Sequence, residues 1–283
     1  MELLDRLEEV FGQRPLAEVN LPGGSIGEVH LIKMADGEQL VAKLGGRAEG
    51  GLLVEAAMLR YLAGHSQLPV PAVIYAEDTL LILEFLPGRS EFSPAAEADA
   101  ARHLAALHTI TAPRFGFDSD TLIGAFSQPN PWSEDWISFF AEQRLLYMGR
   151  LCLEAERLPA SYLRRLEAFC DQLDRWLLAP AAPALVHGDI WATNVLAQGD
   201  QISAFLDPAL YYGHAEVELA YIALFGTFAE PFFRRYQEIR PLPPGFFETR
   251  RDVYNLYPLL VHVRHFGGSY LNGVDRTLAR FGF

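Results

Sequence analysis

Apolar positions fall into short blocks over the first third of the chain. The blocks Leu31–Lys33 and Leu40–Lys43 flank the turn Ala35-Asp36-Gly37, and an Asp-Gly pair is a strong signal for a tight hairpin turn. Two further blocks, Pro69–Tyr75 and Leu80–Phe85, are separated by an acidic turn. Short apolar blocks bounded by turn residues predict two pairs of β-strands in this region.

Helical spacing of apolar residues dominates elsewhere. Leu52–Leu62, between the two strand pairs, has apolar positions at helical spacing, and Met1–Phe11 gathers its apolar residues on one helical face. Apolar runs at Ala184–Val186 and Ile202–Leu206 predict one small strand pair within the remaining, mostly helical, part. The helices predicted in that part cover Ala95–His108, Trp132–Glu156, Ala160–Leu178, Glu216–Phe228 and Tyr254–Tyr270.

This order of elements predicts an α+β chain with two lobes that share one cleft. The N-lobe, residues 1–86, is small and β-rich, and the C-lobe, residues 87–283, is larger and mainly helical. The break falls at Leu86-Pro87-Gly88, where proline and glycine end the apolar pattern. A chain of 283 residues can bury a substantial core, and its 50% hydrophobic content excludes a disordered chain.

Composition and charge exclude several classes of function. The formal net charge of −13 argues against nucleic acid and anionic membrane surfaces as partners, because phosphate recognition relies on clustered Lys and Arg. Met1–Phe11 lacks the basic and apolar regions of a signal peptide, and the longest near-apolar run, Leu219–Ala229, is too short to span a bilayer. Cys152 and Cys170 show no metal-binding spacing, so we expect reduced thiols in a cytoplasmic protein.

The segment ALVHGDIWATNV, with AFLDPA shortly after it, carries the chemistry. Asp189 stands five residues before Asn194, and Asp207 follows thirteen residues later, each at the edge of an apolar run. Phosphoryl transfer needs one carboxylate to receive or orient the attacking hydroxyl, and an amide oxygen with a second carboxylate to hold magnesium. The set therefore predicts a kinase with Asp189 as catalytic base and with Asn194 and Asp207 as ligands of Mg²⁺. We interpret His187 as a structural support of the loop.

A nucleotide site completes this pattern in the amino-terminal third. Glycines in LPGGSIGEV let backbone amides approach phosphate oxygens, and Lys43 ends a short apolar strand where a kinase keeps its phosphate-binding lysine. Glu55 lies early in the following helix, where a carboxylate can pair with Lys43. Backbone groups at the hinge are expected to bond the adenine edge. The residues predicted to bind ATP are Gly23, Gly24, Ser25, Gly27, Lys43, Glu55, Glu84, Phe85 and Leu86.

Longer segments carry a resemblance to a known family. LVHGDIWATNV and FLDPALYYGHAEVELA resemble the fructosamine (ketosamine) kinases, a branch of the aminoglycoside-phosphotransferase and protein-kinase-like superfamily. PGGSIGEV, WISFF ahead of Arg144, and LYPLLVHVRHFGGSYL near the end resemble that family too, so the likeness runs from about Leu21 to Tyr270. It implies a protein-kinase-like fold and ATP-dependent, Mg²⁺-assisted phosphorylation of a hydroxyl on a glycated amine, either a small molecule or a glycated protein lysine.

The resemblance also implies an acceptor site. It favours Trp191, directly after the catalytic pair, as a ring that stacks on the sugar-like acceptor, although the residue alone leaves a core position equally open. Tyr211 and Tyr212 are predicted to bind the acceptor as well. Trp136 and Phe266 are instead expected in the core.

Three departures from the family pattern bear on these expectations. Glu218 stands where the family has Asp; the resemblance implies that this acid braces the catalytic loop, and the longer side chain is expected to do so less well. Ala192 and Thr193 occupy loop positions where smaller or more flexible residues are usual. Pro258 and Val261 replace polar residues in the closing helix, which is expected to reshape the acceptor pocket.

Two other functions stay open on this evidence. A superfamily cousin would phosphorylate an aminoglycoside, choline or another amino alcohol. The other is a nucleotide-binding pseudokinase. Such proteins usually lose at least one catalytic residue, whereas this chain keeps the whole set: Lys43, Glu55, Asp189, Asn194 and Asp207.

The sequence also indicates a constitutively active enzyme without an activation-loop switch. Pro208 follows Asp207, and Gly188 stands where many protein kinases have an arginine.

Overall fold

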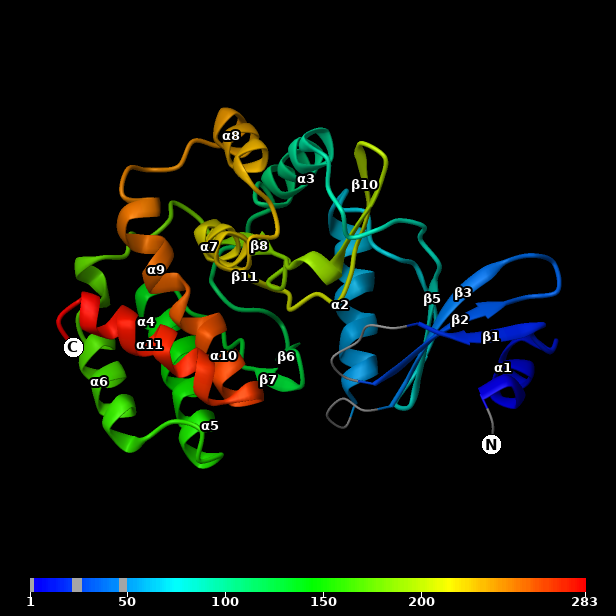
Figure 1. The fold of residues 1–283 in the computed structure, drawn as a ribbon, viewed down its shortest axis with the longest axis horizontal. Coiled ribbons are helices and arrows are strands. Elements are labelled where there is room, and N and C mark those ends of the chain that lie inside the picture. Colours follow the sequence, from blue (N-terminus) through cyan, green and yellow to red (C-terminus); the bar gives the residue numbers. More distant parts are fainter. Residues whose placement is uncertain (1–2, 22–26, 46–49) are drawn as a thin grey trace.

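A β-rich part and a mainly helical part lie side by side in the computed structural model, which describes residues 3–21, 27–45 and 50–283 (Figure 1). This arrangement confirms the predicted α+β class. The first part is a five-stranded antiparallel sheet of order β1-β2-β3-β5-β4 with two helices. Its elements are α1 (Leu3–Phe11), β1 (Ala17–Asn20), β2 (Glu28–Lys33), β3 (Gln39–Leu44), α2 (Gly51–His65), β4 (Val73–Glu77) and β5 (Leu80–Glu84).

The apolar run in β5 explains why the sheet is covered on both faces. Successive side chains of a strand point to opposite faces. Leu80 and Ile82 accordingly pack in the cluster that contains α1, whereas Leu81 and Leu83 pack in the cluster that contains α2. Both helices are thereby fixed against the sheet, and α2 is the helix that carries the predicted Glu55.

The predicted hairpin between β2 and β3 is confirmed. Its register pairs Glu28 with Leu44 and Lys33 with Gln39, and the turn holds Gly37 at a φ of +93°. The Glu38 amide donates to the Asp36 carboxylate at 2.9 Å, which is the local bond that favours Asp in such turns.

The second part is mainly helical and contains three two-stranded antiparallel ladders. The predicted division after residue 86 falls in the connection between β5 and the first of its helices. The ladder strands are β6 (Thr121–Ile123), β7 (Phe126–Gln128), β8 (Ala184–Val186), β9 (Val195–Gln198), β10 (Gln201–Phe205) and β11 (Tyr211–Gly213). The helices are α3 (Pro94–Leu107), α4 (Trp136–Phe140), α5 (Tyr147–Glu154), α6 (Ala160–Cys170), α7 (Ala215–Phe225), α8 (Glu230–Ile239), α9 (Arg251–Tyr254), α10 (Leu256–Phe266) and α11 (Gly268–Arg280).

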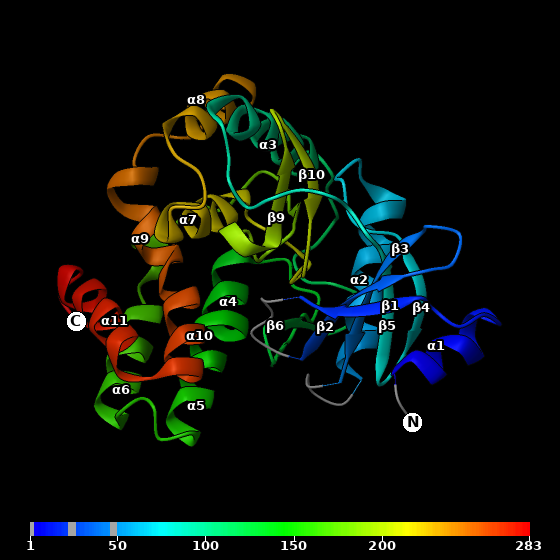
Figure 2. The ribbon, with the colours of Figure 1, turned by 45° about the vertical axis from the view of Figure 1, so that its right-hand side comes forward.

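These ladders and helices place three segments at the junction with the sheet. The catalytic segment leaves β8, and the AFLDPA segment continues from β10. Both views show the β6–β7 hairpin between α10 and the sheet (Figures 1 and 2). The junction is therefore bordered by the sheet on one side and by α10 on the other.

Several predicted boundaries differ from the structure. The helix predicted over Trp132–Glu156 starts only at Trp136, because the Asp135 side chain caps it by accepting from the Ser138 amide at 2.7 Å, and it passes through a π-helical turn at Ala141–Leu146. The helix predicted over Tyr254–Tyr270 is interrupted at Gly267, whose φ is +78°. Ala184–Val186 and the Ile202 run do form strands, but β8 pairs with β11 and β10 pairs with β9, so the predicted pairing of the two runs is wrong. Strands β1, β9 and β11, the β6–β7 hairpin and helix α8 were not predicted.

Candidate functional site

A cleft of about 700 Å³ lies at the junction of the two parts. Lys43 and Glu55 line it from the sheet and α2, and Asp189, Asn194 and Asp207 line it from the helical part. Lys43 and Asp207 lie 164 positions apart in the chain and yet form an ion pair. The structure therefore brings together the residues that the sequence predicted for catalysis, metal binding and phosphate binding.

Lys43 is held between two carboxylates. Its Nζ donates to Glu55 Oε1 at 2.6 Å and also to Asp207 Oδ1. The Glu55 side chain is fully buried, and a buried charge is costly unless a partner of opposite charge compensates it. The pair fixes the direction of the lysine ammonium across the cleft.

Both oxygens of the Asp189 carboxylate are hydrogen bonded. Asn194 Nδ2 donates to Oδ2 at 3.0 Å and to the Asp189 carbonyl at 3.1 Å, while the hydroxyl of Tyr221 donates to Oδ1. Burial and the neighbouring Asp189 charge raise the pKa of Tyr221 well above its ordinary value, so the phenol stays a donor. Tyr221 comes from α7 and also lines the cleft; the sequence analysis did not single it out.

The catalytic loop is tied to α7 and α3 through Glu218. The Gly188 amide donates to Glu218 Oε1 at 2.7 Å, and Oε2 lies 2.8 Å from His108 Nε2. Burial alone would raise the pKa of Glu218, but the bonds from His108 and Gly188 outweigh it and hold that pKa below its ordinary value. Glu218 thus contacts the loop directly through Gly188 and is itself anchored by His108, which agrees with the bracing role that the resemblance implies.

His187, two positions before Asp189, supports the same loop. Its Nδ1 accepts from the Asp189 amide at 3.3 Å. Complete burial lowers the pKa of His187 to about 4, so the ring is neutral near neutral pH. This geometry agrees with a supporting role. His187 is not among the described residues that line the cleft.

Two backbone bonds join the catalytic loop to the Asp207 segment. The Leu206 amide donates to the Asn194 carbonyl at 2.8 Å, and the Ala209 amide donates to the His187 carbonyl at 2.7 Å. Between them Asp207 adopts a φ of +51°, an uncommon conformation for a residue with a Cβ that is often found at functional sites. The predicted base and the predicted metal ligands therefore lie in two segments that backbone hydrogen bonds hold together.

The nucleotide end of the cleft contains most of its predicted residues. Glu84, Phe85 and Leu86 line it. The Glu84 amide donates to the Ala72 carbonyl at 2.9 Å, so this one backbone donor of the predicted hinge is already used within the sheet region. Gly27 adopts a φ of +97°, and a Cβ there would lie 2.9 Å from the Gly45 carbonyl oxygen, so a glycine is required. The predicted residues Gly23, Gly24 and Ser25 lie outside the described residues.

Trp191 and one side of α10 also line the cleft. Val261 lies in this wall, as its departure from the family pattern led us to expect, while Pro258 is not among the lining residues. Trp136 is fully buried, which confirms its predicted core position. Phe266 is 61% exposed and lines the cleft, so its predicted core position is wrong.

Tyr211 and Tyr212 are not among the described residues that line the cleft. Their strand β11 is buried along its whole length, so alternating side chains enter packed interior on both faces. Tyr211 lies 4.0 Å from the guanidinium of the buried Arg144, and the hydroxyl of Tyr212 bonds that of Tyr61 at 2.9 Å. The structure thus does not bring these two tyrosines to the predicted acceptor site.

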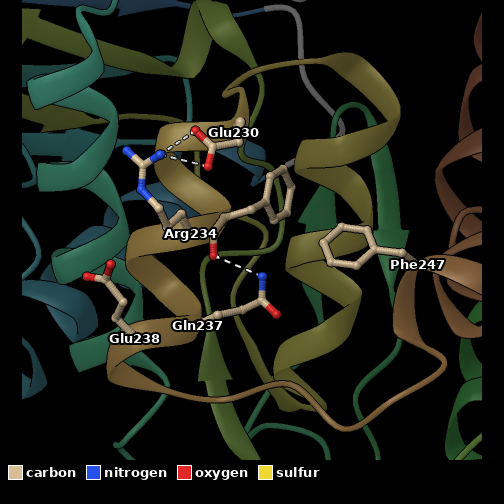
Figure 3. A pocket seen from close by; sticks show the side chains of 6 residues that line it. Glu230, Arg234, Gln237, Glu238 and Phe247 are labelled. Carbon is tan, nitrogen blue, oxygen red and sulfur yellow. Dashed lines mark hydrogen bonds and ion pairs between the residues drawn. The ribbon is translucent and has the colours of Figure 1, made fainter.

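A second hollow, of about 690 Å³, lies between α8 and the segment that carries Phe247 (Figure 3). Glu230 accepts twice from Arg234 at 2.7 Å, and the Gln237 amide donates to the Phe233 carbonyl at 3.3 Å. None of the predicted site residues lines it; Glu230 and Arg234 pair with each other, and Glu238 pairs with the neighbouring Arg235.

Within residues 3–21, 27–45 and 50–283 no group of three or more His, Cys, Asp or Glu side chains is arranged to hold a metal ion. The same residues include no helix long and apolar enough to cross a membrane. A magnesium ion shared between protein and nucleotide needs fewer protein ligands, because Mg²⁺ keeps several waters and binds substrate phosphates.

Comparison with known proteins agrees with this geometry. A family model described as fructosamine kinase matches residues 3–281. A probable ketoamine kinase from Vibrio parahaemolyticus is 36% identical over 277 residues, which are 95% of this chain and 93% of that protein. The crystal structure of a protein assigned as a fructosamine-3-kinase from Thermobifida fusca matches with a TM-score of 0.86 and 32% identity over 99% of both chains.

A more distant neighbour defines the fold class. The aminoglycoside phosphotransferase APH(4)-Ia matches with a TM-score of 0.67 and 18% identity, over 99% of this chain and 95% of its own. That likeness shows the two-lobed, protein-kinase-like fold alone. The family model that matches nearly the whole chain and the relative that is 36% identical over 95% of it lead to one assignment: the chain belongs to the fructosamine kinase family.

Proposed function

We propose that this protein transfers the γ-phosphoryl group of ATP to a hydroxyl of a ketoamine, the glycated form of an amine. The observation that carries this is the convergence of Lys43, Asp189, Asn194 and Asp207 on one cleft, in a chain whose family is described as fructosamine kinase. Relatives named ketoamine kinase support the acceptor class.

Asp189 is the group that receives the proton. The acceptor hydroxyl oxygen forms a bond to the γ-phosphorus while the bond from that phosphorus to the bridging oxygen breaks, and its electron pair leaves with ADP. The hydroxyl proton passes to the Asp189 carboxylate. In a loose transition state a carboxylate of ordinary basicity suffices, and the bonds from Asn194 and Tyr221 fix its orientation.

Lys43 holds the phosphates of the nucleotide, and Glu55 orients the lysine ammonium. The short Lys43–Glu55 bond directs the ammonium toward the cleft, and backbone groups of Phe85 and Leu86 meet the adenine edge. Gly23, Gly24, Ser25 and Gly27 remain predicted phosphate-binding residues.

Asn194 and Asp207 would hold Mg²⁺. Both line the cleft and supply an amide oxygen and a carboxylate, the hard oxygen donors that this ion prefers. The ion would neutralise charge on the phosphates and polarise the γ-phosphoryl group.

The acceptor is a small glycated amine or a glycated lysine on a protein surface, and the cytoplasm is the compartment in which we expect it. Trp191 lines the cleft beside Asp189 and offers a ring face to the sugar. Tyr211 and Tyr212 lie outside the cleft lining, so we propose a packing role for them instead.

The test is a mass-spectrometric assay of purified protein with Mg-ATP and fructosyl- and ribulosyl-lysine. We expect a mass gain of one phosphoryl group that requires Mg²⁺ and is abolished in Asp189→Asn, which should still be stabilised against heat by nucleotide. Transfer at the native rate by Asp189→Asn would refute the assignment of the base.

The same assay separates the competing functions. Transfer only to aminoglycosides or amino alcohols would place the protein with the phosphotransferases whose fold it shares. Tight nucleotide binding without transfer to any acceptor would identify a pseudokinase.

A further inference from the structure

Charge is distributed unevenly over the cleft. Every carboxylate among the described lining residues comes from the sheet, from α2 or from the catalytic segments. Helix α10 contributes no carboxylate and no permanently charged group to the lining. Its lining residues are Val261, His262, His265 and Phe266.

The two histidines of this wall are neutral near neutral pH. His262 Nδ1 lies 2.8 Å from the Pro258 carbonyl, which can only accept, so Nδ1 carries the proton and Nε2 a lone pair. Burial lowers the pKa of both rings, and for His265 the neighbouring His262 and Arg264 lower it further. The α10 wall is therefore aromatic and uncharged.

Ring contacts extend this wall to the mouth of the cleft. His265 packs against Phe126 of β7 at 4.3 Å and against Phe266 at 5.4 Å, measured between ring centroids. His262 packs at 4.8 Å against Tyr270 of α11. We call these five residues the aromatic rim. The rim connects the β6–β7 hairpin to α10 and α11, so its position is set by three elements.

One member of the rim is poorly covered by the rest of the protein. Phe266 is 61% exposed although it borders the cleft. Exposed phenyl area is unfavourable in water, and an apolar group that covers it is stabilised in return. A neutral aromatic face also attracts a secondary ammonium group through its π-electrons.

We propose that the aromatic rim binds the amine substituent of the ketoamine and makes the enzyme prefer aromatic or long aliphatic amines. This inference rests on the proposed function. With the reacting hydroxyl at Asp189 and the sugar against Trp191, the substituent on the sugar's amine carbon runs toward the mouth of the cleft, where α10 stands. Methylamine-derived ketoamines are too short to cover Phe266. The positive charge beside the rim is that of Arg264, whose guanidinium lies 4.9 Å from the centroid of the Phe126 ring and is not among the described cleft-lining residues.

The experiment compares two acceptors that share one sugar, the N-benzyl and the N-methyl derivatives of a 1-amino-1-deoxyketose. We expect the unmodified enzyme to use the benzyl compound with a kcat/KM about tenfold higher. Phe266→Ala should reduce that ratio by about 3- to 10-fold, mainly through KM for the benzyl compound. Ile239→Ala removes a side chain 44% exposed on α8, away from the cleft, and should leave both efficiencies unchanged.

The outcomes separate this inference from the proposed function. Equal efficiency with both ketoamines, or an unchanged ratio in Phe266→Ala, would overturn the role of the rim and leave the ketoamine kinase in place. Failure of the unmodified enzyme to phosphorylate either compound, or the lysine adducts, would overturn the proposed function itself.

Discussion

The amide of Gly188 donates a 2.7 Å hydrogen bond to the carboxylate of Glu218, thirty positions further along the chain. Through this bond α7 holds the residue that precedes Asp189, the proposed catalytic base. The second oxygen of the same carboxylate bonds His108 on the turn after α3, so the position of the loop depends on a buried polar network.

Shortening this side chain should loosen the loop. Glu218→Asp cannot reach both Gly188 and His108, and one buried partner is left unsatisfied at a cost of about 1–3 kcal/mol. We expect a corresponding loss in the free energy of unfolding and a kcat reduced about tenfold. Urea denaturation and steady-state kinetics measure the two effects. Unchanged stability and rate would show that a shorter acid braces the loop equally well.

Gly188 should not tolerate a side chain. Its φ is +87°, and a Cβ would lie 2.3 Å from the Ala209 carbonyl oxygen, a backbone atom that cannot move aside. Gly188→Ala should therefore lower the free energy of unfolding by about 3 kcal/mol or more. Gly199→Ala is the matched control, because Gly199 also has a positive φ, +64°, but its Cβ would meet open space. The control should lose only about 1–2 kcal/mol, and equal losses would contradict the steric argument.

The Tyr221 hydroxyl should matter for turnover rather than for nucleotide binding. Tyr221→Phe removes only the donor to Asp189 Oδ1, so the carboxylate is less well oriented and kcat should fall about tenfold. The Kd for Mg-ADP, measured by calorimetry, should stay the same. In Tyr254→Phe a buried hydroxyl that accepts from Trp136 in the core is removed; this control should lose stability but keep its kcat. A normal kcat in Tyr221→Phe would exclude the positioning role.

Stability should fall in mildly acidic solution. Burial lowers the pKa of His187 to about 4 and, together with nearby positive charge, that of His214 to about 3, from an ordinary value of 6.5. Below pH 6.5 these two histidines become protonated in the unfolded chain but stay neutral in the folded protein. The free energy of unfolding should thus decrease from pH 6.5 toward pH 4 by about 1 kcal/mol per pH unit for each histidine.

Denaturation series at several pH values test this dependence. His214→Asn keeps a side chain that can cap α7, as His214 does by accepting from the Glu216 amide. The variant should lose less stability between pH 6.5 and pH 4 than the unmodified protein. If the free energy of unfolding changed with pH equally in both proteins, His214 would not contribute to the pH dependence.

Much of the fold and the catalytic half of the site could be predicted from the sequence. Lys43, Asp189 and Asp207 each come after an apolar run that forms a strand. The position of the strand therefore determines where the polar side chain at or near its end lies. The short spacing between Asp189 and Asn194 limits how far apart their side chains can lie. For these residues local pattern and tertiary position agree.

The acceptor half of the site depends on packing between distant segments, and local pattern does not encode that. Tyr211 resembles an acceptor residue by its neighbours in sequence, yet its strand is covered on both faces. Phe266 lies on an apolar helix, yet the helix ends at the cleft mouth and leaves the ring exposed. Tyr221 follows Glu218 by three positions on one helical face, a spacing that could have indicated a second contact with the catalytic loop.

The two backbone bonds between the catalytic loop and the Asp207 segment have a consequence for how such an enzyme can diversify. They join the loop and the Asp207 segment into one hydrogen-bonded module, whereas His262, His265 and Phe266, which we propose to meet the amine, come from a helix that begins only at Leu256. If the aromatic rim binds the amine as proposed, exchange of side chains along α10 would direct the enzyme to a new amine while this module is inherited unchanged.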